Sequence, residues 1–272
     1  MSGPSSHLGP PPLASLGRDL LGTSPRQRSL ALTRPVLGVG AFAVVGYFRL
    51  WWLAPVIVFS IFVSVVTVTH DVVHDTLDMS RGASELALFA LGAALLESGH
   101  AYRITHTQHH RVFPGPDDPE GDPARLSLPG AILHGPLFLP RLWWWAACRT
   151  RGRRSEQLWL LAEASFAIGF IAVAVLLRPL TPIPLLYAGL VIAGSWTYPL
   201  LTVHLPHRHY GETALTQTHT VRGRIIPAIF LELTYHLEHH LFPQVPSHNL
   251  PELARRLDPF LCEAGIEPIR VP

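Results

Sequence analysis

The sequence predicts an all-α integral membrane protein, in which four transmembrane helices carry a helical cap at the cytoplasmic interface. The chain has 272 residues, of which 48% are hydrophobic and 15% are charged, whereas about a quarter of the residues in a soluble domain are charged. Its mean hydropathy is +0.27. Sixteen histidines stand beside only 19 acidic residues. Since the chain otherwise avoids ionisable groups, this excess of imidazoles requires a functional explanation.

Composition excludes two other classes of protein. The 21 basic residues are all arginines and the formal net charge is only +2, so the chain offers no dedicated nucleic-acid surface. The two cysteines, Cys148 and Cys262, are too few for a disulfide framework or a thiolate metal cluster. We therefore expect no nucleic-acid partner and no sulfur chemistry.

The first two crossings lie in residues 35–69, after a Pro-, Ser- and Gly-rich segment, residues 1–34, which we expect to be a mobile cytoplasmic tail. A straight helix over residues 35–69 would be about 50 Å long, whereas a hydrocarbon core is about 30 Å thick. A hairpin of two helices therefore fits better. The cluster of Tyr47, Arg49 and Trp51 is typical of a membrane interface and places the turn at the far surface.

Two further crossings follow. Residues 158–177 and 183–203 are apolar and long enough to span, and residues 178–182 between them suffice only for a turn. By contrast, residues 86–96 would reach only about 16 Å as a helix. Residues 128–148 contain three prolines and a run of tryptophans. We expect these last two segments to lie at the interface rather than to span it.

Four crossings bring both chain ends to one side of the membrane. All arginines except Arg49 and Arg178 then lie on that side, which the positive-inside rule identifies as the cytoplasm. The expected organisation is a tail over residues 1–34, a membrane catalytic domain over residues 35–257 and a C-terminal tail over residues 258–272.

Half of the histidines fall into three short patterns. These are His70-Asp-Val-Val-His74, His106-Thr-Gln-His109-His110 and His236-Leu-Glu-His239-His240. Residues three and four positions apart share one face of a helix, so each pattern directs its imidazoles toward one point. All three patterns follow the cytoplasmic ends of hydrophobic segments. We therefore expect them to converge on one site.

This convergence predicts a metal centre. Eight imidazoles exceed the three or four ligands that one zinc ion takes, so the count favours two ions, and imidazole ligands with open positions suit iron that must bind oxygen. A zinc protease would require His-Glu-x-x-His, which none of the patterns supplies. Five other histidines are expected to be ordinary core or interfacial residues: His7, His134, His209, His219 and His248.

One HxxxH pattern followed by two HxxHH patterns resembles the membrane fatty-acid desaturase and hydroxylase superfamily. The resemblance covers residues 35–257. It implies a non-haem di-iron centre at the cytoplasmic face of four membrane helices. It also implies that the protein reduces O2 with electrons from a partner and oxidises a C–H bond of a lipid.

Finer similarities point to two substrates. Residues 235–250 look like the third-box region of acyl-lipid desaturases, whereas Asp117-Asp118-Pro119 and Leu205-Pro206-His207-Arg208 are similar to carotenoid ring ketolases and hydroxylases. The resemblance therefore implies desaturation or hydroxylation of a fatty-acyl chain, with a carotenoid ring as the alternative substrate.

The resemblance also implies a ligand between the fourth crossing and the third pattern. The spacing from His207 to the third pattern matches the family better, and His204 is the alternative ligand. Asp71 and Glu232 each lie one turn before a patterned histidine. Each is expected either to orient that imidazole by accepting its other N–H or to be an ordinary solvated acid. Arg103 matches a common family position or contacts lipid headgroups.

Electrons must come from outside, because the chain contains no haem-binding domain and no flavin or dinucleotide fingerprint. We expect a ferredoxin-like or cytochrome-like donor at the cytoplasmic face. A membrane metal transporter would need ligands near the middle of the membrane, where the apolar segments contain none. An inactive lipid-binding scaffold that has kept the fold is the other alternative, and the intact histidine patterns disfavour it.

Overall fold

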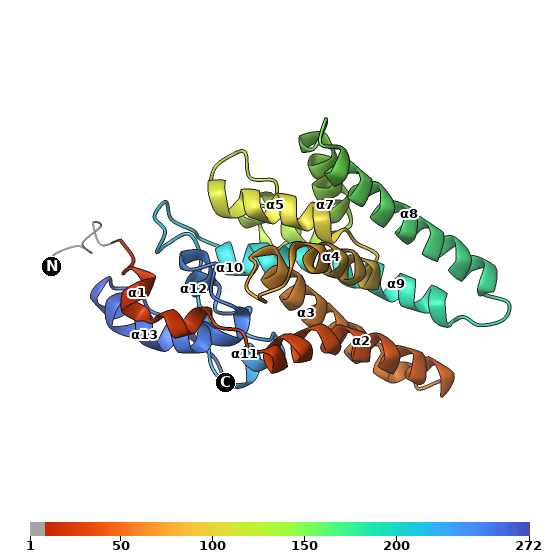
Figure 1. Ribbon diagram of the computed structural model, residues 1–272, viewed down its shortest axis with the longest axis horizontal. Helices are drawn as coiled ribbons and strands as arrows, with labels where there is room; N and C mark the ends of the chain where they lie inside the picture. The colour runs from red at the N-terminus through yellow and green to blue at the C-terminus, as the bar shows by residue number, and fades with distance from the viewer. Residues whose placement is uncertain (1–8) are drawn as a thin grey trace.

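The computed structural model describes residues 9–272 and is almost entirely helical (Figure 1). Its α-helices are α1 (Leu13–Leu16), α2 (Pro25–Tyr47), α3 (Ala54–Val73), α4 (Arg81–Leu95), α5 (Gly99–Val112), α6 (Asp122–Arg125), α7 (Leu128–Arg149), α8 (Arg154–Leu177), α9 (Ile183–Ser195), α10 (Leu205–His207), α11 (Ile225–Ile229), α12 (His236–Leu241) and α13 (Leu250–Glu263). The shorter turns are η1 (Arg18–Leu21), η2 (Trp51–Leu53), η3 (Pro199–His204) and η4 (Ser247–Asn249). Strands β1 (Val221–Arg222) and β2 (Ile269–Arg270) form one parallel pair.

Four helical segments in residues 9–272 are long and apolar enough to cross a membrane. They are Arg18–Tyr47, Trp51–Val73, Arg154–Leu177 and Ile183–His207. The expected four-helix membrane fold is therefore confirmed, and the protein is an integral membrane protein. Neither α4 nor α7 is among the four segments, as the sequence predicted.

The membrane part has a narrow core and an apolar exterior. Phe42 of α2, Ile61 of α3, Leu88 of α4 and Val191 of α9 are buried in one cluster. Outside it, large apolar side chains face outward, such as Leu176 of α8, which is 77% exposed. Such a surface would be costly in water, whereas lipid tails solvate it without penalty.

The N-terminal tail is shorter than expected. Helix α2 begins at Pro25 instead of at residue 35, because Ser24 and Gln27 cap it reciprocally and proline is favoured in the first turn. Leu20, in η1, is buried against the cluster around α13. Only residues 1–8 of the expected tail, His7 included, lie outside the described residues.

The C-terminal segment is also more ordered than predicted. Helix α13 continues to Glu263 and buries Leu261, so residue 258 does not begin a tail. Arg256 of α13 also pairs with Asp19, with 2.7 Å between Nη2 and Oδ2. Figure 1 shows α1 and α13 side by side at one end of the molecule, opposite the far ends of α2, α8 and α9. The two chain ends thus build a cap together with α12.

Helices α4 and α5 form a tight hairpin beneath this cap. A Cβ atom at Gly99 would lie 2.3 Å from the carbonyl oxygen of Leu88, so only glycine allows this approach. Ser80 and Ser98 accept hydrogen bonds from the first turns of α4 and α5. The hairpin therefore returns α5 toward the end of α3 in a fixed orientation.

Candidate metal centre

Helix geometry brings the three histidine patterns together. His70 and His74 lie at the end of α3, the second pattern lies in the last two turns of α5, and the third forms α12. His207 arrives on the short helix α10, after the π-helical turn η3. Because each pattern presents one helix face, the rings from these helices meet in one place.

The imidazoles form two groups with closely spaced ligand nitrogens. Within each group, these atoms lie within 4.8 Å of one another. The first group is His70, His74, His106, His110 and His239, and the second is His109, His207 and His240. His236 adjoins the second group, because its Nε2 is 3.1 Å from the Nε2 atoms of both His207 and His240.

The spacing of the nitrogens suits metal coordination. The remaining Nε2–Nε2 distances are 2.8 Å for His70–His239 and His110–His239, 3.1 Å for His106–His110 and 3.3 Å for His109–His207. Two nitrogens bound at right angles to one ion, each about 2.1 Å from it, lie about 3 Å apart. The observed distances therefore fit neighbouring ligands of a common ion.

Hydrogen bonds to Nδ1 fix the tautomers of two rings, those of His109 and His207. The Nδ1 of His109 is 2.8 Å from Oδ2 of Asp118, and the Nδ1 of His207 donates to the carbonyl oxygen of Gln217 at 2.9 Å. With both protons on Nδ1, each Nε2 presents a lone pair, and these lone pairs face each other. A metal ion between these two nitrogens would satisfy both lone pairs.

An unpartnered nitrogen in the first group supports the same conclusion. Among residues 9–272, the buried Nε2 of His74 has no hydrogen-bond partner, whereas the Nε2 atoms of the other rings of this group approach one another. Burial lowers the pKa of His74 to about 4 and that of His239 well below its usual value. The rings of His74 and His239 are therefore neutral, which is the form that binds a metal.

Two carboxylates behind the second pattern were not predicted as functional residues. Oε2 of Glu120 lies 3.2 Å from Nδ1 of His106, while Asp118 contacts His109. Burial opposes protonation of His109, but the hydrogen bond and charge of Asp118 outweigh it and raise its pKa. In the sequence, Asp118 is marked only by the similarity of Asp117-Asp118-Pro119 to carotenoid enzymes. No local pattern predicts its contact with His109, because the chain must first fold back over the end of α5.

The residues predicted to orient histidines have other contacts. Oδ1 of the buried Asp71 accepts hydrogen bonds from the backbone N–H of Ser247 at 3.0 Å and from its hydroxyl at 2.7 Å, so it joins α3 to the cap. Glu232 is half-buried and, among the described residues, its carboxylate makes no hydrogen bond to His236. His204, the alternative ligand, donates Nδ1–H to the carbonyl of Pro123 at 2.9 Å and lies outside both groups.

Arg103 belongs to a buried network that the sequence did not reveal. It donates to Glu85 at 2.9 Å and to Glu156 at 3.2 Å. Glu85 also lies 2.8 Å from Nε2 of His100, whose Nδ1 is 2.8 Å from Glu163. His100 is fully buried. This network fastens α5 to α4 and α8 and thereby holds the second histidine pattern in place.

One half-buried acid near the centre has a buried carboxylate oxygen without a partner. Oε1 of Glu97, between α4 and α5, has no hydrogen bond among residues 9–272, and burial raises its pKa to about 8. It lines a cavity of about 20 Å³ together with Tyr102 and Thr69. The Tyr102 ring stacks on His106 at 4.7 Å between centroids. The protonated, neutral form of the Glu97 carboxyl group is therefore favoured near neutral pH.

Comparison with known proteins agrees with this geometry. The family described as fatty acid desaturase matches residues 49–270. No curated protein matches the chain. The matched segment contains all nine clustered histidines and the loop with Asp118 and Glu120, so it spans the whole site.

Proposed function

Because the chain belongs to the fatty acid desaturase family, we propose that it is a membrane di-iron oxidoreductase that uses O2 and external electrons to desaturate or hydroxylate a fatty-acyl lipid chain. The observation that carries this proposal is the pair of imidazole groups. Nine histidines surround the centre, no cysteine joins them among the described residues, and such a donor set suits iron with open positions.

In this proposal each imidazole group holds one iron ion, and His236 completes the second group. Bound iron would supply the reduction of O2 and an oxidant able to remove hydrogen from a methylene group. Asp118 and Glu120 hold the rings of His109 and His106 through Nδ1. Fixed rings would keep their Nε2 lone pairs directed toward a bound metal.

The surrounding residues bury the part of this centre around His109 and His207. His207 and His109 are 0% and 2% exposed. The ring of Phe113 packs on both, with centroids 4.3 Å and 5.1 Å away. A dry site strengthens electrostatic interactions and protects a reactive oxidant from side reactions.

The proposal is tested by expression in a host whose acyl lipids and pigments are known. New unsaturated or hydroxylated acyl chains support it, and oxidised carotenoid rings instead would assign the alternative substrate. His110→Ala and His239→Ala should lose metal and activity together. His134→Ala is the control, because His134 lies on α7 outside both groups. A protein that binds one zinc ion, and whose variants stay active, would contradict the proposal.

We further propose that the site faces the cytoplasm and receives electrons there from a separate ferredoxin-like or cytochrome-like protein. The support is the arginine distribution over the four crossings. In a variant without Cys148 and Cys262, a single cysteine at Thr181 should react with an impermeant reagent outside the cell. Cysteines at Ser80 and Glu267 should react only after lysis, and the reverse pattern would exclude this orientation.

A further inference from the structure

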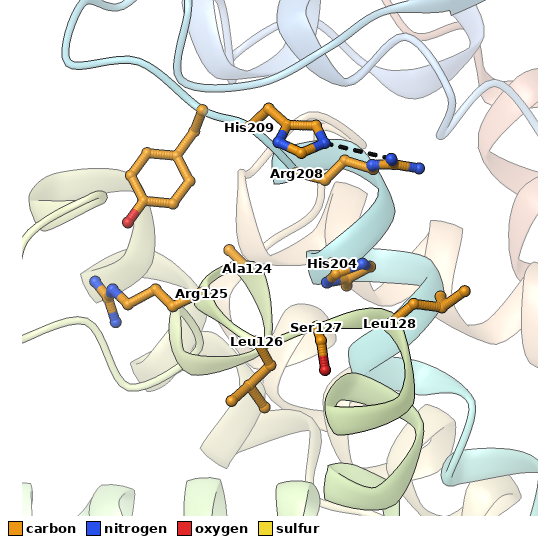
Figure 2. Close-up of a pocket in the computed structure, with 9 residues that line it drawn as sticks. Ala124, Arg125, Leu126, Ser127, Leu128, His204, Arg208 and His209 are labelled. Atoms are coloured by element: carbon orange, nitrogen blue, oxygen red, sulfur yellow. Dashed lines mark hydrogen bonds between the residues drawn. The ribbon is translucent and has the colours of Figure 1, made fainter.

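A cavity of about 430 Å³ lies beside the helix that carries His207, outside both imidazole groups (Figure 2). One wall is formed by the end of η3 and the residues after it, with His204, Arg208 and His209, and the other runs from the end of α6 to the first residue of α7. Figure 2 shows Arg208 and His209 above His204, with Ser127 and Leu128 below them. The proposed chemistry at the metal centre uses none of these residues.

The charge of the walls favours an anion. Arg125, Arg208 and two histidines line the cavity, and within the described chain none of the lining residues is acidic. Asp122, close in sequence, is shared by Arg125 and Arg141 at 3.5 Å and 2.7 Å. The positive charge of the cavity is therefore not neutralised by its own walls.

Arg208 is the cation available for a ligand. It takes part in no ion pair among residues 9–272, and its Nη2 only approaches Nε2 of His209 at 3.3 Å. Arg125, in contrast, is held by the carbonyl oxygens of Pro114 and Gly115 at 2.8 Å and 2.7 Å. A guanidinium without a carboxylate partner can bind a phosphate or carboxylate through two parallel hydrogen bonds.

The N-terminus of α7 also favours an anion in the cavity. Ser127 caps the helix by accepting a hydrogen bond from the N–H of Gly130, and Leu128 is its first residue. The helix is 22 residues long, so the partial positive charge of its N-terminus also faces the cavity region. This contribution alone would not define a site, but it has the same sign as Arg208.

The cavity continues into an apolar surface. Leu126 and Leu128 are 38% and 51% exposed, and Ile132, one turn further along α7, is 51% exposed. Trp144, near the other end of α7, is 69% exposed. An outward apolar face with tryptophan is typical of a helix at the membrane interface. The ligand that fits is therefore amphipathic, with an anionic end and an apolar chain.

We propose that this cavity binds the anionic headgroup of a membrane lipid. The phosphate or carboxylate would lie against Arg208, and the acyl chain would follow Leu128 and Ile132 along α7. This inference goes beyond the proposed oxidation chemistry and does not depend on it. Since Arg208 directly follows His207 in the chain, a bound headgroup would also hold the segment that brings this imidazole to the centre.

The test measures binding without turnover, so that its outcome is separate from that of the proposed activity. The full-length protein in a neutral detergent is titrated with phosphatidylglycerol, and bound lipid is counted by native mass spectrometry. We expect one saturable lipid per chain. Arg208→Gln should weaken it about tenfold, the loss of one charge-assisted contact of about 1.4 kcal/mol. Arg81→Gln is the matched control, because Arg81 is exposed and lies away from the cavity.

A second variant and two other probes complete the test. Leu128→Glu puts a negative charge at an exposed position of the cavity wall and should also abolish saturable binding. Phosphatidylcholine should bind at least tenfold more weakly than phosphatidylglycerol, and glycerol phosphate, which lacks the chains, more weakly still. Equal binding of phosphatidylcholine would overturn the role of charge. Equal binding of glycerol phosphate would identify a free-anion site, and unchanged binding in both variants would exclude this cavity.

Discussion

Replacing Asp118 by asparagine should weaken one of the two metal sites. Asp118 is buried, and its two oxygens have different partners: Oδ1 accepts the N–H of Glu120 at 2.9 Å, and Oδ2 faces Nδ1 of His109 at 2.8 Å. In Asp118→Asn the oxygen stays with the N–H of Glu120, so the amide nitrogen faces His109. The amide then donates to Nδ1, and the ring must carry its proton on Nε2.

This tautomer removes the lone pair that His109 offers to a metal. Nε2 of His109 lies 3.3 Å from Nε2 of His207, so a proton there would occupy the second imidazole group. Loss of such an orienting partner typically lowers metal affinity about 10- to 100-fold, which is about 1.4 to 2.7 kcal/mol. The first group does not contain His109. We therefore expect one ion per chain to bind normally and the other to bind more weakly.

An anaerobic titration with Fe(II) against a coloured chelator measures both affinities. Asp117→Asn is the matched control, because it makes the same chemical change at an exposed neighbouring residue. The spectrum of the weaker site should also change, since its ligand field loses an imidazole. Binding of both ions by Asp118→Asn with the affinity of the unmodified protein would refute the tautomer argument. An equal loss in Asp117→Asn would show that the effect comes from the net charge.

Three further predictions concern stability and the choice of ligand. Gly99→Ala should lower the free energy of unfolding by about 1–3 kcal/mol, because its Cβ would meet a carbonyl of α4 at 2.3 Å. Gly82→Ala is the control and should not lower it, because the space around Gly82 is open. Equal melting temperatures of the two variants would contradict this prediction. Glu97 has its pKa raised from 4.5 to about 8, so the folded protein binds the proton more tightly and loses up to about 5 kcal/mol of stability as pH rises between these values. The melting temperature should therefore fall from pH 5 to pH 8 more steeply than in Glu97→Gln, and parallel curves would disprove it. His207→Ala should lose iron while His219→Ala keeps it, as measured by iron content per chain, and the opposite order would show that His207 is not the additional ligand.

The membrane fold was predictable because its determinants are local. A span is a continuous apolar stretch, and the four observed segments correspond to the four predicted crossings. The ends of the chain were predicted less well. Residues 1–34 are rich in turn-forming residues, but Leu20 and Leu261 bury side chains in the same cluster. Such a contact joins distant parts of the sequence, and no local pattern reveals it.

The difference between local patterns and long-range contacts also explains which site residues the sequence predicts and which it does not. Imidazoles at positions i, i+3 and i+4 share a helix face, so the eight patterned histidines could be grouped before the fold was known. His100 has no patterned partner, and its contacts with Glu85 and Glu163 depend on how α4 and α8 pack around α5. Asp71 lies one turn before His74, but its hydrogen bonds go to Ser247. Spacing predicts which side chains share a face, but not which neighbour that face meets.

The loop after α5 connects the two imidazole groups. Glu120 contacts His106 of the first group and Asp118 contacts His109 of the second. The N–H of Glu120 also donates to Asp118, so the two carboxylates move together. Thr105 of α5 donates to Glu120 at 2.7 Å and anchors the loop to the helix that carries both rings. Because one short loop orients a ligand in each group, a change that displaces the whole loop should alter both proposed metal sites, whereas Asp118→Asn, which keeps the bond to the N–H of Glu120, should act on the second site alone.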